Sequence, residues 1–150
     1  MNFYDSGADI AHAFFDRWNR GDAEAVAELF IEDADFVNVV GYWWKTRRQI
    51  QKAHEYGFRR IFQHAVVEII ELKAREATPD IHIVHTVSTL KEQSGISAEK
   101  TETRIAVISM VAVRQQENGF LIVSCHNTDR VEGADTHIRT GSRFTPVSYA

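Results

Sequence analysis

Cysteine and proline are scarce in this chain of 150 residues. Cys125 is the single cysteine, so no disulfide can form within the chain, and this suits a reducing compartment. Only two prolines occur, Pro79 and Pro146, and no stretch rich in proline and glycine divides the sequence. These features predict one domain without a cross-link or a flexible linker, long enough to bury a substantial core.

Positive charge and long apolar runs are also lacking. Lys and Arg number 17 against 21 Asp and Glu, a net charge of −4, which argues against binding to nucleic acid or to an anionic membrane. The longest nearly apolar stretch, residues 106–113, is far shorter than the about 20 residues that cross a bilayer. Residues 1–15 show no basic region followed by an apolar run, so no secretory leader is predicted and the expected location is cytoplasmic.

The first half of the chain has the pattern of three helices. Ser6 and Asp22 are suitable N-caps for the first two, and Gly21 between them is a suitable helix stop. Thr46, with Gln49 three residues later, forms a capping box for the third. The apolar stripe of this third helix recurs at positions i, i+3, i+4, i+7, i+8 and i+11. Its members are Ile50, Ala53, His54, Gly57, Phe58 and Ile61.

The second half has the alternation and turn residues of β-strands. Strands are predicted at residues 66–77, 81–90, 103–114 and 120–127, after an earlier one at residues 34–39. Helices come first and strands later, which predicts an α+β fold with three N-terminal helices packed on an antiparallel sheet. Residues 129–150 are polar and weakly patterned, so we expect an extended or partly disordered arm beyond a domain of residues 1–128.

The strand predicted at residues 103–114 is apolar on both faces. One face carries Ile105, Val107, Ser109, Val111 and Val113, and the other carries Ala106, Ile108, Met110 and Ala112. A strand that is apolar on both faces is covered on both. Because the helices can cover only one face, we expect a homodimer made through the outer face of the sheet.

Several short motifs, taken in order, resemble a known family. They are Gly21-Asp22, the run Asp-Ala-Asp-Phe-Val-Asn at residues 33–38 with Gly41 and Trp44, Ile50 and His54, Pro79-Asp80 before His85, and His126-Asn127-Thr128. Over residues 8–128 the chain resembles the SnoaL-like members of the nuclear transport factor 2-like superfamily, and within them the SgcJ/EcaC-type proteins. The resemblance implies a cystatin-like cone, in which a curved antiparallel sheet wraps around the helices, and which is commonly dimeric.

Two histidines are the candidates for chemistry. His54 is a titratable side chain on an apolar stripe, so it either is a hydrogen-bonded core residue or lines a pocket. On the last strand, His126 and Asn127 point to opposite faces, and alternation alone does not choose between them. The resemblance favours His126. It therefore implies that His54 and His126 face one cavity and act as acid and base.

Other residues are candidates for binding a ligand. Trp18, Trp44, Phe58 and Phe62 belong either to the core or to an aromatic-walled cavity. The resemblance adds His85, as a second pocket imidazole, and Asn38, which stands where ketosteroid isomerases of the superfamily carry a catalytic aspartate. A carboxamide cannot accept a proton, so isomerisation by a carboxylate is not expected. Asn38 would orient a ligand carbonyl or a water, or would simply end a strand.

No metal and no cofactor are predicted. His82 and His85 lie three residues apart on a strand, which places them on opposite faces, and no G-x-G-x-x-G nucleotide motif occurs. Two functions stay open. One is a dehydratase, isomerase or cyclase that uses histidine chemistry on a polyketide- or steroid-like hydrophobic ligand. The other is a non-catalytic module for ligand binding or dimerisation.

Overall fold

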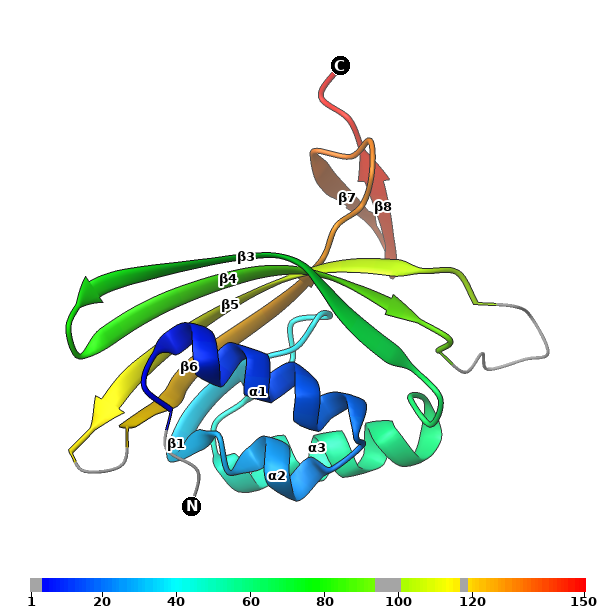
Figure 1. The fold of residues 1–150 in the computed structure, drawn as a ribbon. Helices are drawn as coiled ribbons and strands as arrows, with labels where there is room; N and C mark the ends of the chain where they lie inside the picture. The colour runs from blue at the N-terminus through cyan, green and yellow to red at the C-terminus, as the bar shows by residue number, and fades with distance from the viewer. Residues whose placement is uncertain (1–3, 94–100, 117–118) are drawn as a thin grey trace.

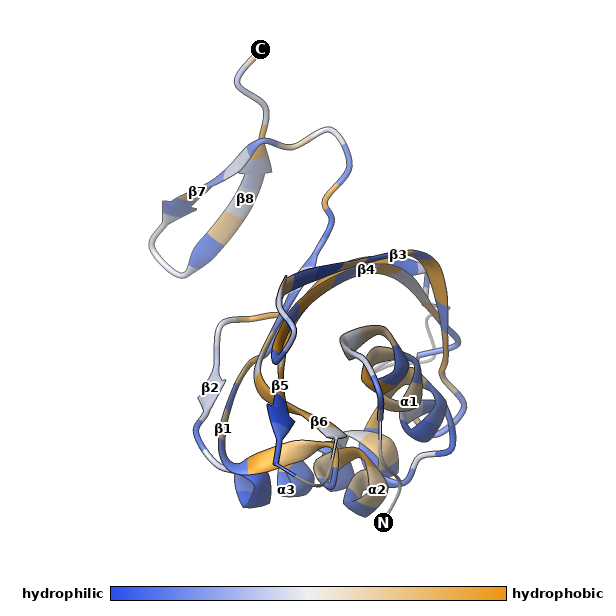
Figure 2. Ribbon diagram, turned by 60° about the vertical axis from the view of Figure 1, so that its left-hand side comes forward, coloured by the Kyte–Doolittle hydropathy of each residue, from blue (hydrophilic) through white to orange (hydrophobic). Residues whose placement is uncertain are grey.

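The computed structural model describes residues 4–93, 101–116 and 119–150. The elements are α1 (Gly7–Asn19), α2 (Ala23–Ala27), β1 (Phe30–Val37), β2 (Trp43–Trp44), α3 (Arg47–Arg60), β3 (Val66–Thr78), β4 (Ile81–Lys91), β5 (Arg104–Gln115), β6 (Gly119–Asp129), β7 (Thr136–Thr140) and β8 (Arg143–Val147). The three helices lie against the inner side of a bent sheet, and β3 and β4 curve over α1 (Figures 1 and 2). The predicted α+β fold with helices on a curved sheet is confirmed.

The sheet is mixed rather than purely antiparallel. Its strand order is β2-β1-β6-β5-β4-β3. The neighbours β3, β4, β5 and β6 pair antiparallel, whereas β1 pairs parallel with β6, with Phe36 beside Cys125. The parallel pair forms because β1 joins the sheet beside the last long strand rather than beside its neighbours in sequence. Strand β1 also begins four residues earlier than residue 34, because buried Phe30 already pairs with Ile122.

The helix starts follow the capping residues. Ser6 accepts a hydrogen bond from the Asp9 amide, and Asp22 accepts one from Ala25. Thr46 likewise accepts from Gln49, whose own side chain accepts from the Lys45 amide. Each cap satisfies amides that the first helical turn leaves without an intrahelical partner. These short-range contacts fix where α1 and α3 begin, and thus which side chains face the sheet.

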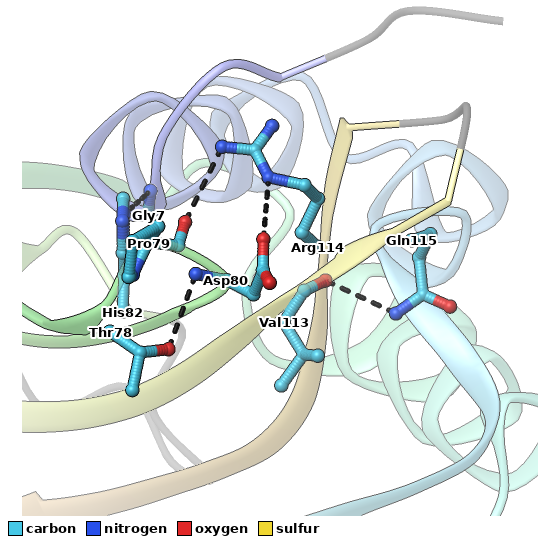
Figure 3. Close-up of polar contacts among 8 residues, drawn as sticks. All are labelled: Gly7, Thr78, Pro79, Asp80, His82, Val113, Arg114 and Gln115. Atoms are coloured by element: carbon cyan, nitrogen blue, oxygen red, sulfur yellow. Dashed lines mark hydrogen bonds and ion pairs between the residues drawn. The ribbon is translucent and has the colours of Figure 1, made fainter.

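The N-terminus of α1 is tied to β4 by an unusually close approach (Figure 3). The Gly7 amide donates to Nδ1 of His82 over 2.9 Å, and the His82 ring lies 4.3 Å from that of Phe120. The Arg114 guanidinium lies over the Phe120 ring, 4.6 Å from its centroid. The Nε of Arg114 donates a hydrogen bond to the Asp80 carboxylate over 3.1 Å. A Cβ on Gly7 would meet the His82 Cβ at 2.6 Å. Only glycine fits here without a shift of the helix.

A β-bulge in β6 reverses the expected alternation. Val111 of β5 pairs with Ser124, but the next residue, Ala112, pairs with Ile122, so Val123 is an extra residue in β6. After the bulge the inner positions are the odd-numbered ones, and Cys125 is buried while His126 is exposed. The prediction that His126 faces the cavity is therefore wrong, because one extra residue turns every later side chain to the opposite face.

The last residues form an arm that stands away from the domain. Strands β7 and β8 pair with each other across a two-residue turn at Gly141 and Ser142. Figures 1 and 2 show this hairpin on the outer side of the sheet, opposite the helices. The tail expected to be extended or partly disordered thus contains regular structure. Within the described ranges, no helix has the length and apolar character needed to cross a bilayer.

Candidate functional site

A cavity of about 180 Å³ lies between the helices and the inner face of the sheet. Its walls are mostly aromatic: Phe14, Phe15, Trp18, Phe36, Trp44, Phe58 and Phe62. Its polar lining consists of Asn38, His54, Ser88, Arg104 and Asn127. No Asp or Glu is among the described lining residues. An apolar cavity with a few convergent polar groups has the character of a small-molecule site.

His54 lines this cavity, and its own helix binds one of its ring nitrogens. Its Nδ1 lies 2.8 Å from the carbonyl oxygen of Ile50, one helical turn earlier. A carbonyl can only accept, so Nδ1 carries the proton, and in the neutral ring Nε2 keeps its lone pair. Nε2 lies on the ring edge away from that carbonyl, and it has no hydrogen-bond partner among the described residues. The α3 backbone thus fixes the tautomer in which Nε2 can accept a proton.

Aromatic rings surround His54. Phe36 is 5.6 Å away between ring centroids, Phe58 5.8 Å, and Phe14 and Trp44 each 6.2 Å. Burial among these rings lowers the pKa of His54, and the hydrogen bond to the Ile50 carbonyl opposes this only in part. The ring is therefore neutral at physiological pH. This is the protonation state that a general base requires.

Asn127 forms the polar side of the cavity, where the resemblance favoured His126. Its Oδ1 is sealed from solvent and accepts no hydrogen bond from any described residue. A buried acceptor without a partner costs about 1–3 kcal/mol, so such groups are almost always satisfied by something. Only a donor could satisfy Oδ1, whereas the Nδ2 group of the same cavity-lining side chain is a donor and can bind a ligand oxygen.

Arg104 also lines the cavity, but its charge is already balanced. Its guanidinium donates to the carboxylate of Asp129, with Nη2 2.8 Å from Oδ1. The two groups lie across the paired ends of β5 and β6, both partly exposed. A carboxylate ligand would have to compete with Asp129 for this cation. The electrostatics of the cavity therefore favour a neutral ligand.

Asn38 lines the cavity, but its carbonyl is used locally. Its Oδ1 accepts hydrogen bonds from the amides of Val40 and Tyr42, at 3.1 and 2.8 Å. The Asn38 amide itself donates to the Tyr42 carbonyl. Asn38 thus stabilises the turn between β1 and β2. The turn positions Trp44 against Phe36. Of the two predicted roles for Asn38, its contacts show the structural one, at the end of a strand.

The structure separates the predicted site residues into two groups. His54, Asn38, Trp18, Trp44, Phe58 and Phe62 all line the cavity. His85 and His126 do not: both are exposed, on the outer face of β4 and β6. The prediction for His85 is wrong because inward positions on β4 are even-numbered, as buried His82, Val84 and Thr86 show. His82 and His85 do point to opposite faces, as their spacing indicated.

Three polar lining residues were missed: Ser88, Arg104 and Asn127. Ser88 and Arg104 carry no sequence signal beyond alternation with apolar neighbours, and only the position of the helices shows that they border a cavity. Cys125, also inward, is buried, and burial strongly raises the pKa of its thiol, so it is not a nucleophile. Among the residues the structure describes, no three His, Cys, Asp or Glu side chains are placed to hold a metal ion.

Comparison with known proteins identifies the family. The model of the SnoaL-like domain matches residues 11–123. The chain belongs to the SnoaL-like domain family. This match covers every described cavity-lining residue except Asn127, and it leaves the β7–β8 arm outside. The narrower SgcJ/EcaC-type assignment stays a prediction, and no curated protein matches the sequence.

Solved structures agree with the SnoaL-like fold. An uncharacterised protein with a cystatin-like fold from Caulobacter vibrioides is 26% identical, with a TM-score of 0.74 over 82% of this chain and 86% of that one. A ketosteroid isomerase-like protein from Erwinia carotovora (12% identity, TM-score 0.68, 81% and 92% covered) and a candidate dehydratase of the NTF2-like family from Streptomyces avermitilis (14%, 0.69, 81% and 91%) share the fold. At these identities the last two comparisons concern the fold alone.

Proposed function

We propose that this SnoaL-like domain binds a compact, neutral carbonyl compound and that His54 removes a proton from the carbon beside the carbonyl. The observation that carries the proposal is the Nδ1–H bond to the Ile50 carbonyl, which leaves Nε2 as a base in an aromatic cavity. The reaction class is that of an isomerase or a dehydratase. Absence of a carboxylate from the described lining makes His54 the base rather than an aspartate.

The proton balance needs no other reactant. The C–H bond breaks, its proton goes to Nε2, and the electron pair moves onto the carbonyl oxygen as an enolate. The Asn127 amide is the donor on hand for that oxygen, since the Arg104 guanidinium is engaged by Asp129. The imidazolium then returns the proton, either to another carbon, which completes an isomerisation, or to a leaving hydroxyl, which completes a dehydration. The Ile50 carbonyl stabilises the imidazolium between these steps.

The size of the cavity limits the ligand. A cavity of about 150 Å³ holds one benzene ring, and this one measures about 180 Å³. A ligand of one ring therefore fits, and so does a ligand of two fused rings if the edge of one ring lies at the opening of the cavity. A four-ring steroid would project from it. We expect a ligand smaller than the polyketides and steroids that the resemblance suggests.

A ligand with a polar oxygen should depend on Asn127. We expect 2-tetralone, a bicyclic ketone, to bind more tightly than tetralin, the same rings without the carbonyl. In Asn127→Leu this preference should disappear, a loss of about 5- to 30-fold in 2-tetralone affinity for one hydrogen bond of about 1–2 kcal/mol. Ligand-observed NMR titration measures both dissociation constants. Equal affinity of wild type for the two compounds would contradict the proposed polar recognition.

A non-catalytic binding module is the second candidate. One observation favours it. Among the described lining residues, His54 is the only side chain that can gain and lose a proton near neutral pH, so no second acid or base lies beside it to transfer the proton. The two candidates differ in one measurable property. A binding module would hold 2-tetralone without exchanging its acidic protons.

A further inference from the structure

The turn between β1 and β2 carries two exposed apolar side chains beside the cavity. Val40 and Tyr42 are 84% and 64% exposed. Three of the residues around them in the chain, Asn38, Val39 and Trp44, line the cavity. A single exposed apolar side chain is common on a protein surface and needs no explanation. Two that continue the wall of an aromatic cavity are different, because the turn and the cavity then form one apolar surface.

Four hydrogen bonds hold this turn in one shape. The Asn38 Oδ1 accepts from the amides of Val40 and Tyr42. The Asn38 amide donates to the Tyr42 carbonyl, and the Gly41 amide donates to the Asn38 carbonyl, each over 2.9 Å. Gly41 has a φ of +85°, which glycine adopts without strain. The two apolar side chains are thus presented by a fixed backbone, and a preformed surface lowers the entropic cost of binding.

Tyr42 lies on the cavity side of the turn. Alternate residues of an extended chain point to the same side, so Tyr42 shares a side with Trp44, and their ring centroids are 6.1 Å apart. Trp44 is in turn 6.2 Å from the ring of His54. Trp43 points the other way, and its Nε1 donates to Asp35 over 2.7 Å. Trp44 therefore stands between His54 inside the cavity and Tyr42 outside it, one ring contact from each.

We propose that Val40 and Tyr42 form an outer subsite, which binds a flat apolar group that the ligand carries at the end away from its carbonyl. A cavity of about 180 Å³ holds little more than one ring, so a further ring has to lie outside it. A ring that leaves along Trp44 meets Tyr42. The preferred ligand is then an aryl-substituted carbonyl compound. This inference rests on the proposed function, because it places the carbonyl at His54.

The subsite is tested with two ketones that differ by one ring. The first is 2-tetralone, and the second is 6-phenyl-2-tetralone, whose extra ring lies at the end away from the carbonyl. Wild type should bind the phenyl compound more tightly, and Tyr42→Ser should weaken its binding about 2- to 12-fold, the usual contribution of an aromatic pair. Affinity for 2-tetralone should not change, because Tyr42 is not among the described lining residues. Ligand-observed NMR titration measures all four dissociation constants.

Tyr149→Ser is the matched control for Tyr42→Ser. It removes a tyrosine ring that is 80% exposed in the C-terminal segment, and it should leave the affinity for both ketones at the wild-type value. Val40→Ser gives a second test of the subsite and should also weaken binding of the phenyl compound alone. Equal affinity of wild type for the two ketones would overturn the outer subsite. So would an equal affinity of Tyr42→Ser and Tyr149→Ser for 6-phenyl-2-tetralone.

Two further measurements separate a failure of the subsite from a failure of the proposed base. Intermolecular NOEs should join the phenyl protons of the bound ketone to the Tyr42 ring, and NOEs from the phenyl ring to His54 instead would overturn the orientation. Exchange of the acidic protons of 2-tetralone with D₂O tests the base without the outer ring. Exchange in wild type together with no gain from the phenyl ring would refute the subsite and leave the proposed function standing. A gain that depends on Tyr42, without exchange, would support the subsite and refute the base.

Discussion

In His54→Gln, exchange of the acidic protons of 2-tetralone with D₂O will fall about 10²- to 10⁴-fold, the usual contribution of a general base. Glutamine is close to histidine in size, and its amide can still donate to the Ile50 carbonyl. It cannot accept a proton near neutral pH. Proton NMR of the ketone in D₂O measures the exchange, and titration of 2-tetralone should show nearly unchanged binding.

Two matched variants separate His54 from the other histidines. His12→Gln changes an exposed residue of α1, and His126→Gln changes the residue that the resemblance placed in the cavity. Both should exchange 2-tetralone protons at the wild-type rate. A large loss of exchange in His126→Gln would mean that the His126 side chain takes part in the reaction, which contradicts its outward position in the structure.

The pH dependence of the same exchange follows from burial. Because burial holds the pKa of His54 below the 6.5 usual for histidine, the base form predominates at pH 7. The rate should thus change little above pH 7 and fall at lower pH as Nε2 becomes protonated. A rate that still rises steeply above pH 7 would contradict a neutral His54.

In Gly7→Ala, the protein will lose roughly 2–4 kcal/mol of stability. The added methyl would lie 2.6 Å from the His82 Cβ and 3.0 Å from Val84 Cγ2. Neither atom is the free end of a flexible chain, so α1 must move. Overpacking of this kind costs about 1–3 kcal/mol, and the stretched bond from the Gly7 amide to His82 adds about 0.5–1.5 kcal/mol. Thermal unfolding should show a midpoint about 5–15 °C lower.

Gly57→Ala is the matched control for Gly7→Ala. Both glycines are helical, but a Cβ at Gly57 meets only the Phe62 ring, at 3.2 Å, and that ring can shift. Alanine also favours the helix by about 1 kcal/mol. Gly57→Ala should therefore be close to wild type in stability. An unfolding midpoint of Gly7→Ala equal to that of Gly57→Ala would contradict the close packing of α1 on β4.

Local contacts made much of this fold predictable. Ser6, Asp22 and Thr46 cap the helices because each reaches the amide three residues later, and such contacts can be recognised in a sequence. The stripe that holds Ile50, His54 and Phe58 has the helical period, so the cavity-facing side of α3 followed from it. Of the predicted site residues, that stripe placed His54 and Phe58 at the cavity.

Long-range pairing made the rest unpredictable. The bulge at Val123 depends on how β6 pairs with β5, and no residue there marks it, since valine is common in regular strands. It moved Asn127 inward and His126 outward. The parallel pairing of β1 with β6 joins segments about 90 residues apart and leaves no local signal. Strand alternation alone left His126 and Asn127 both open, and the resemblance favoured the one that faces outward.

The most direct test of the proposed base is a long-range ¹H–¹⁵N NMR spectrum of the His54 ring, recorded across pH with and without 2-tetralone. A proton on Nδ1, a bare Nε2 at neutral pH, and a pKa below 6.5 are expected. The Nε2 resonance should also shift with 2-tetralone and much less with tetralin. A proton on Nε2, a pKa above 6.5, or a ring that does not respond to the ketone would contradict the account.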